Sequence, residues 1–158
     1  MNLDELAKIA REEKLQLPVS AVALQRSVAT SALALFHEPL LAMVIAIMAR
    51  YQKGELKASE VSVWSAAVLA NSYVGLRIQQ RLMLEWSATF RERCAGALVI
   101  LETLELIGFN GSDRKIVLSE KGKATVKKLV DGTDDAGLLA RKLQKSCNDA
   151  FRLGLTLL

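Results

Sequence analysis

The chain is poor in the residue types that carry most enzyme chemistry. Its 158 residues include one histidine, His37, and two cysteines, Cys94 and Cys147. The cysteines form no CxxC pair and no metal-ligand cluster, so we interpret them as reduced, partly buried thiols rather than as a disulfide or a metal site. His37 has no Ser or Cys nucleophile at a recognisable spacing, and no glycine-rich phosphate loop is present. The sequence therefore predicts a protein without catalysis and without a cofactor.

Long hydrophobic runs and aromatic residues are also scarce. The longest uncharged run, residues 61–76, is shorter than the roughly 20 residues that cross a bilayer. The first residues are charged and amphipathic, unlike a signal peptide. We therefore expect a cytoplasmic protein with no membrane contact, which also suits reduced cysteines. Since only 5% of the residues are aromatic, the core should be built from aliphatic side chains.

Apolar residues are plentiful instead. They make up 51% of the chain, slightly above the ~45–50% that is usual for soluble domains. A surplus of apolar surface points to a homodimer or to an obligate protein partner. A well-filled helical core would explain the same excess, and the composition leaves these two interpretations open.

Apolar residues at helical spacing, with turn and capping signals between them, predict one mainly α domain over residues 1–158. The first part, 1–86, is expected to be helical and to carry an oligomer or partner surface. The middle part, 87–131, should contain a helix that a Thr89–Glu92 capping box opens and that Gly108 ends in a left-handed conformation. The last part, 132–158, is expected to be a C-terminal helix. The other expected helices cover residues 2–15, 18–36, 39–52 and 120–130, with a further one starting near Ser59.

Two helix faces are candidates for a protein interface. The helix expected to begin at Pro39 has no charge between Leu40 and Ala49. A helix that is apolar all round is either buried on all sides or lies in an interface. The helix expected over 90–107 has an outward face that is small and apolar, which suits packing against protein. The interface candidates are therefore Leu40, Met43, Val44, Ile47, Gly96 and Val99.

A short hairpin with basic flanks follows, near residues 109–118. "NGSDR" has turn chemistry, and "KIVLS" has β propensity, with Ile116 and Leu118 on the face expected to pack on the core. Ser119 is placed to cap the next helix. The order helix, glycine, strand, charged turn, strand, Ser, Lys-Gly, helix resembles the wing of a winged-helix domain, and is most similar to the pattern of the multiple-antibiotic-resistance (MarR-like) regulators. The matching residues are Leu104, Glu105, Gly108, Phe109, Asp113, Arg114, Leu118, Ser119, Lys121 and Gly122.

The resemblance implies a winged-helix element within residues 87–131 and basic side chains that reach DNA phosphates. Such contacts act through counterion release and carry little sequence information. The charge pattern agrees, because ten Lys and Arg stand against six Asp and Glu from Asn110 onward, in a chain whose net charge is +4. The DNA-binding candidates are Arg91, Arg93, Arg114, Lys115, Lys121 and Lys123.

Two functions follow as hypotheses. The first is a non-enzymatic winged-helix protein that binds double-stranded DNA, a transcription regulator making mainly phosphate-backbone contacts. The alternative is an adaptor subunit of a multiprotein ATPase complex, of the chromosome-maintenance type or of a three-component phage-defence system, which binds protein rather than DNA. The basic wing favours the first. The apolar helix faces favour the second, and Glu92 and Glu102 on the helix before the wing would repel phosphates.

Overall fold

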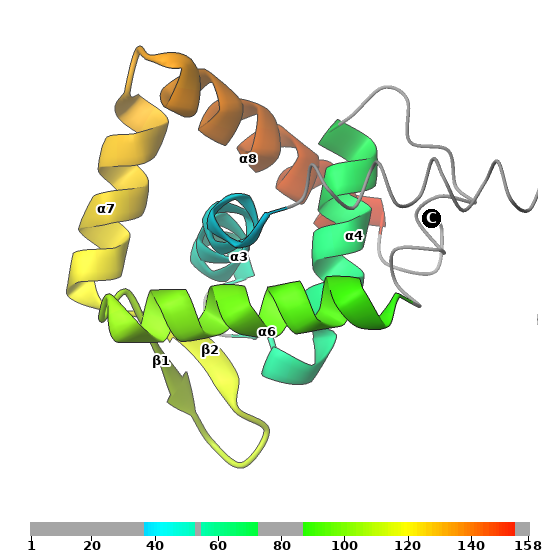
Figure 1. Ribbon diagram of the computed structural model, residues 1–158. Helices are drawn as coiled ribbons and strands as arrows, with labels where there is room; N and C mark the ends of the chain where they lie inside the picture. The colour runs from blue at the N-terminus through cyan, green and yellow to red at the C-terminus, as the bar shows by residue number, and fades with distance from the viewer. Residues whose placement is uncertain (1–36, 53–54, 73–86, 154–158) are drawn as a thin grey trace, which may run out of the picture. The chain divides into compact units, whose positions relative to one another are not determined.

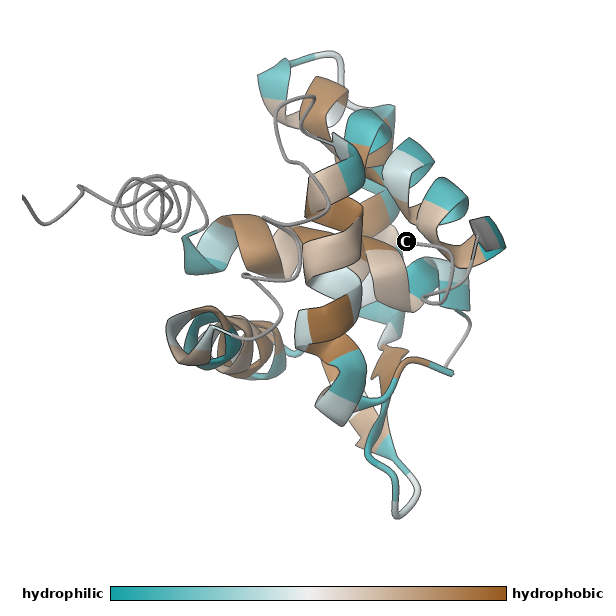
Figure 2. Cartoon of the chain, turned by 90° about the vertical axis from the view of Figure 1, so that its right-hand side faces the viewer, coloured by the Kyte–Doolittle hydropathy of each residue, from teal (hydrophilic) through white to brown (hydrophobic). Residues whose placement is uncertain are grey.

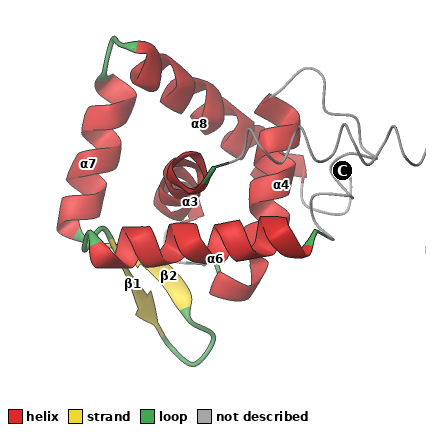
Figure 3. Cartoon of the chain, in the orientation of Figure 1, coloured by secondary structure: helices red, strands yellow, loops and turns green. Residues whose placement is uncertain are grey.

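A computed structural model describes residues 37–52, 55–72 and 87–153 of the chain. All of them belong to one compact unit, Leu33–Leu158, and the helices expected over 2–15 and 18–36 lie outside the described residues. The mainly α class with a small hairpin is confirmed in this part (Figures 1 and 3). Its elements are α3 (Glu38–Gln52), the short 3₁₀ helix η1 (Ala58–Glu60), α4 (Val61–Ser72), α6 (Ala88–Thr103), β1 (Ile107–Asn110), β2 (Lys115–Leu118), α7 (Glu120–Asp131) and α8 (Asp135–Leu153).

Helix α3 is the centre of the unit. It is seen almost end-on in Figure 1, and it contacts α4, α6, α7, α8 and β2. Leu40 is 8% exposed, and the side chains of Val44 and Ile47 are completely buried. Burial of an aliphatic side chain of this size contributes about 1.5–3 kcal/mol. The apolar character of this helix therefore makes a core, and the interface assignment of Leu40, Val44 and Ile47 is corrected, while Met43 is half-buried.

The start of α3 explains the single histidine. The backbone N–H of Leu40 donates to Nδ1 of His37 over 3.3 Å, so the imidazole occupies the place of an N-terminal cap. Pro39 stands in the first turn, where its missing N–H costs no hydrogen bond. The sequence explains the break before this helix, and the structure gives His37 a capping contact.

Helix α8, the last described element of the chain, completes the core by packing on α3 and α4. Ala140, Leu143, Cys147 and Ala150 are fully buried and repeat at helical spacing along one face. That face packs on α3 and α4. In Figure 2 the apolar residues gather where the helices meet, and hydrophilic residues lie along their outer sides. At its C-terminal end, the ring of Phe151 stands edge-on to that of Trp64 on α4, with the ring centroids 4.6 Å apart.

Strands β1 and β2 form an antiparallel hairpin that a third segment extends. Ile107 pairs with Leu118, and Asn110 pairs with Lys115. On the other side of β2, the N–H of Ile116 donates to the carbonyl of Leu56 over 2.7 Å, and the N–H of Ala58 donates to the carbonyl of Arg114 over 3.1 Å. The segment just before η1 therefore fixes the hairpin to the helical core. The predicted inward face is confirmed, since Ile116 is fully buried and Leu118 is 6% exposed.

The two ends of α6 differ from the sequence prediction. The Ser87 hydroxyl, rather than Thr89, accepts the N–H of Phe90 and caps the helix, so the predicted capping box is wrong. The C-terminal end comes before Gly108, which lies in β1. Glu105 takes the left-handed conformation instead, at φ 58°. The N–H of Leu106 then reaches the carbonyl of Leu101 over 2.9 Å, as in a Schellman ending.

Candidate interaction surfaces

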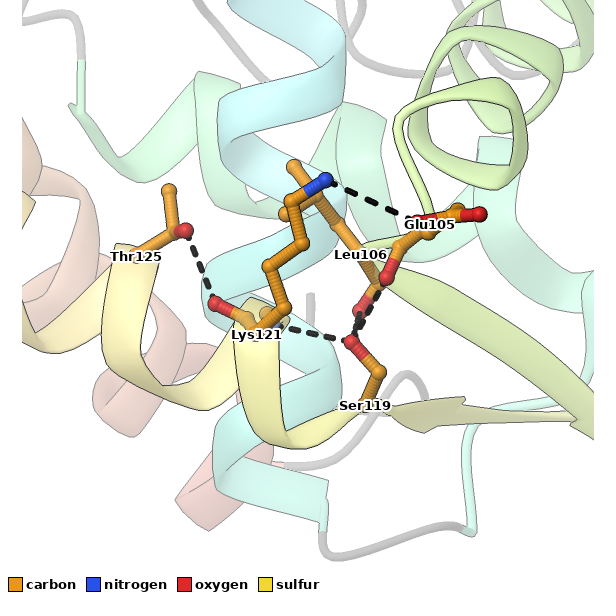
Figure 4. Close-up of polar contacts among 6 residues, drawn as sticks. Glu105, Leu106, Ser119, Lys121 and Thr125 are labelled. Atoms are coloured by element: carbon orange, nitrogen blue, oxygen red, sulfur yellow. Dashed lines mark hydrogen bonds and ion pairs between the residues drawn. The ribbon is translucent and has the colours of Figure 1, made fainter.

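The junction between the hairpin and α7 is tightly fixed by Ser119 (Figure 4). Its hydroxyl accepts the N–H of Gly122 over 2.9 Å and caps α7, as predicted. The same hydroxyl lies 2.7 Å from the carbonyl oxygen of Glu105, to which it donates. A side chain at position 122 would collide with the carbonyl of Leu106, so glycine is required for the first turn of α7 to approach the end of α6. The Lys-Gly pair of the sequence pattern thus has a packing reason.

The outer face of the hairpin is lined with ion pairs. Nζ of Lys115 lies 2.8 Å from Oε2 of Glu55, and Nζ of Lys57 lies 3.7 Å from Oδ2 of Asp113. The hydrogen bond between Glu55 and Lys115 lowers the pKa of the carboxyl and raises the pKa of the ammonium. A DNA-binding candidate, Lys115, is therefore engaged by a carboxylate from a segment sixty residues earlier in the chain.

Arg114 occupies the tip of the hairpin. It takes a left-handed backbone conformation at φ 48°, and its guanidinium carbon lies 4.5 Å from the centroid of the Phe109 ring. This stacked arrangement is a cation–π contact and holds the side chain against the hairpin. Within the described ranges no carboxylate pairs with Arg114, so it is the hairpin cation with the most accessible charge.

The two lysines at the start of α7 are also paired. Nζ of Lys123 lies 2.6 Å from Oε1 of Glu120, one turn earlier on the same helix. Nζ of Lys121 lies 3.8 Å from Oε2 of Glu105, across the junction shown in Figure 4. Both pairs are exposed, so each contributes little to stability. Their carboxylates nevertheless offset much of the positive potential that a phosphate would meet.

The exposed face of α6 is small, apolar and mixed in charge. Val99 is 60% exposed, and Ala95 and Glu92 lie on the same side of the helix. Arg91 is exposed on this side too, with Glu102 close to it on the helical wheel. The sum of these charges gives no excess of cations along the helix that precedes the hairpin.

Two other candidates on α6 do not join that face. Arg93 is half-buried and leaves the helix on the opposite side, two residues away from Arg91, where it is held by contacts within the chain. Gly96 lies beneath the side chain of Glu38, whose Oε1 is 2.6 Å from the place a Cβ would occupy. These atoms are the end of a flexible side chain that can move aside, so the contact does not require glycine at position 96. Of the interface candidates, Val99 is exposed on the open face of α6, at 60%.

A set of exposed cations away from the hairpin was not predicted as a site from the sequence. Arg50 lies in the last turn of α3, Lys127 lies on α7, and Lys145 and Arg152 lie on α8; all four are exposed. Within the described part of the chain, no carboxylate pairs with any of them. Arg141 differs, because Nη1 donates to the carbonyls of Val130 and Gly132 and so caps the end of α7. For Lys127, Lys145 and Arg152 the excess of Lys and Arg after Asn110 was a signal, although it was taken to support the hairpin; no sequence signal pointed to Arg50.

The two cysteines lie in the core. Cys94 and Cys147 are both buried free thiols, and burial raises the pKa of each to about 12. Among the described residues, no three His, Cys, Asp or Glu side chains gather closely enough to hold a metal ion. None of the helices described is both long enough and apolar enough to cross a membrane.

Comparison with known protein families, with curated proteins and with solved structures gives no match for this chain.

Proposed function

We propose that this protein is a non-catalytic subunit that binds another protein through the exposed face of α6. The observation that carries the proposal is that three of the candidate DNA-binding lysines, one on the hairpin and two at the start of α7, are paired with carboxylates. Lys115 faces Glu55, Lys121 faces Glu105, and Lys123 faces Glu120. A surface that gains affinity by releasing counterions from DNA needs cations that are not already neutralised.

The face of α6 has the composition of a protein contact. Val99 offers an exposed apolar side chain, and Ala95 leaves room for another backbone to come close. Arg91, Glu92 and Glu102 surround them with polar groups of both signs, as at the rim of a protein interface. A helix that reads the major groove needs donors and acceptors directed at base edges, and this face has few of them.

As the partner we propose a large ATPase of a multiprotein complex, as in the adaptor hypothesis. The hydrogen bonds of Ser119 fix the C-terminal end of α6 to the start of α7, which supports docking through a preformed helix face. A rigid helix face loses little conformational entropy when it docks.

DNA binding remains the second candidate, and Arg114 is the observation that favours it. Its charge stands at the tip of the hairpin without a carboxylate partner among the described residues. On this hypothesis, a fluorescent duplex binds at about 50 mM salt, and Arg114→Glu weakens the binding and flattens its salt dependence.

The deciding experiment compares the two surfaces in one preparation. The tagged full chain is isolated from cells that express it naturally, and the same protein is titrated with the duplex. We expect a stoichiometric protein partner, retained at moderate salt, and no effect of Arg114→Glu on it. Val99→Glu should lower the affinity for this partner by about tenfold or more, because the apolar centre of an interface carries most of its binding energy.

Lys145→Glu on α8 serves as the matched control, since it also introduces a carboxylate at an exposed helical position. Duplex binding that Arg114→Glu abolishes, together with the absence of any partner sensitive to Val99→Glu, would overturn the proposal in favour of the DNA hypothesis.

A further inference from the structure

A hollow on the surface is lined by described residues of which none belongs to α6. It is bounded by the last turn of α3, by the end of β2 and by one face of α7. Its apolar part comes from Ala49, Val117, Leu118 and Ala124. Val117 is 38% exposed, because its side chain points away from the core face of the hairpin into this hollow. The hollow thus presents apolar surface beside α7, a helix whose other exposed residues are hydrophilic.

The rim of the hollow is positively charged. Arg50 contributes one cation from α3, and Lys123 and Lys127 contribute two from α7, against the single carboxylate of Glu120. The four α7 residues that line it, at positions 120, 123, 124 and 127, repeat at helical spacing, so they share one face. Glu120 is engaged by Lys123, which leaves Arg50 and Lys127 without a carboxylate partner among the described residues.

The apolar floor and the positively charged rim together favour one class of ligand over others. Nucleic-acid phosphates would satisfy Arg50 and Lys127, but on a duplex the sugar-phosphate backbone that reaches this rim carries no flexible apolar side chain to cover Val117. An uncharged apolar segment would cover Val117 and leave the two cations partly desolvated without a counter-charge, which is costly. A segment with apolar side chains on one face and carboxylates beside them satisfies both parts.

We propose that the hollow binds an acidic, amphipathic segment of a partner protein, with its carboxylates at Arg50 and Lys127 and an apolar side chain on Val117. The inference deepens the proposed protein-binding function, on which it rests, but it uses a surface separate from α6. The two contacts therefore fail independently, and each has its own variant.

The experiment uses random 16-residue peptides displayed on phage and selected against the full chain. We expect enrichment of peptides that combine Asp or Glu with Leu, Ile or Phe. Their affinity should fall about tenfold or more in the double variant Arg50→Glu Lys127→Glu, because two attractive charge contacts become repulsive. Val117→Asp should weaken the same peptides by removing the apolar contact.

The matched control is Lys145→Glu Arg152→Glu, which makes the same change in net charge on the outer face of α8. It should leave peptide affinity within about twofold at physiological salt, where surface charges beyond a Debye length are screened. Circular dichroism should show that all variants keep their helices. Val99→Glu should leave peptide binding intact, so a failure of the α6 contact is distinguished from a failure of the hollow.

Three results would overturn the inference. One is a selection without enrichment, and another is an enriched set that lacks carboxylates. The third is an equal loss in the two double variants, because that would show a general response to net charge rather than binding in the hollow.

Discussion

The two sides of the described unit treat positive charge differently. Around the hairpin, Lys57, Lys115 and Lys121 each face a carboxylate, and two of the three carboxylates come from distant parts of the chain. On α7 and α8, exposed cations such as Lys127 and Arg152 face no carboxylate among the described residues. Net charge alone therefore does not locate a binding surface, because the pairing of the cations decides which of them an anionic partner can use.

Labelling of the two buried thiols would compare how readily the α6 and α8 sides of the core open. Of the predictions, the slowing of this reaction by folding is the largest effect expected. Cys94 lies on α6 and Cys147 on α8, and both are buried. Reaction with a thiol reagent near pH 8 should be slower than in the unfolded chain by a factor of about 10³ or more, because it requires opening of the structure.

The single variants Cys94→Ala and Cys147→Ala show which labelling rate belongs to which cysteine. Faster labelling of Cys94 would show that the α6 side opens more readily than the α8 side. Labelling of both thiols at the rate of the unfolded protein would contradict their placement in the core.

Gly122→Ala should weaken the contact between the start of α7 and the end of α6. A Cβ at this position would collide with the carbonyl of Leu106, so α7 must move away from the end of α6. We expect the free energy of unfolding to fall by about 2–3 kcal/mol, measured by denaturant titration.

Gly108→Ala is the control for this change, because nothing lies within 4 Å of the place its Cβ would take. It should change the free energy of unfolding by about 0.5 kcal/mol or less. Equal effects of the two substitutions would refute the close approach at Gly122.

Glu105→Gly should stabilise the protein slightly at the point where α6 leads into the hairpin. A residue other than glycine at φ 58° carries a steric cost that glycine avoids. The expected gain is about 1 kcal/mol, less a small loss from the exposed pair with Lys121. Arg114→Gly relieves a similar strain but loses the contact with Phe109, so its gain in a melting experiment should be smaller.

Glu55→Gln should make the hairpin side resemble the α7 and α8 side. It leaves Lys115 unpaired, with little change in folding stability, since the pair is exposed. If the freed ammonium gains one phosphate contact, the slope of log affinity against log salt should steepen by about 0.9 for duplex DNA. Unchanged duplex binding would show that the carboxylate does not mask this lysine.

The sign of the pH dependence follows from the same pair. The pKa of Glu55 is lowered in the folded protein, so the pair contributes stability above the usual carboxyl pKa and loses it as the pH falls through the lowered value. The pKa of Lys115 is raised, so its share is lost only as the pH rises through that raised value. The small difference in stability between the protein and Glu55→Gln should therefore be present at neutral pH and vanish in acid.

The sequence was most informative where local chemistry determines the structure. Ser119 as a cap and the alternation of Ile116 and Leu118 were predicted because each depends on neighbours a few residues away. The ending of α6 was not predicted. Gly108 was preferred on propensity, whereas the left-handed residue is Glu105, and the N–H of Leu106 bonds to the carbonyl of Leu101.

The candidate site was predicted less well, for a physical reason. The sequence shows the cations at the hairpin but not what faces them: the partner of Lys115 is Glu55, and no local pattern connects positions sixty residues apart. The hollow was also hidden in the sequence, since its lining comes from α3, β2 and α7. Only the fold brings Arg50 and Lys127 to one rim.

The strand-like contact of residues 56–58 has a consequence for solubility. The stretch Lys115–Leu118 contains three consecutive aliphatic residues of high β propensity, and a two-stranded hairpin would present it along an open edge. Because Leu56 accepts the N–H of Ile116, that edge is already occupied from within the chain. Loss of this short contact would expose a template for intermolecular strand pairing, so the segment before η1 protects the protein against aggregation as well as supporting the hairpin.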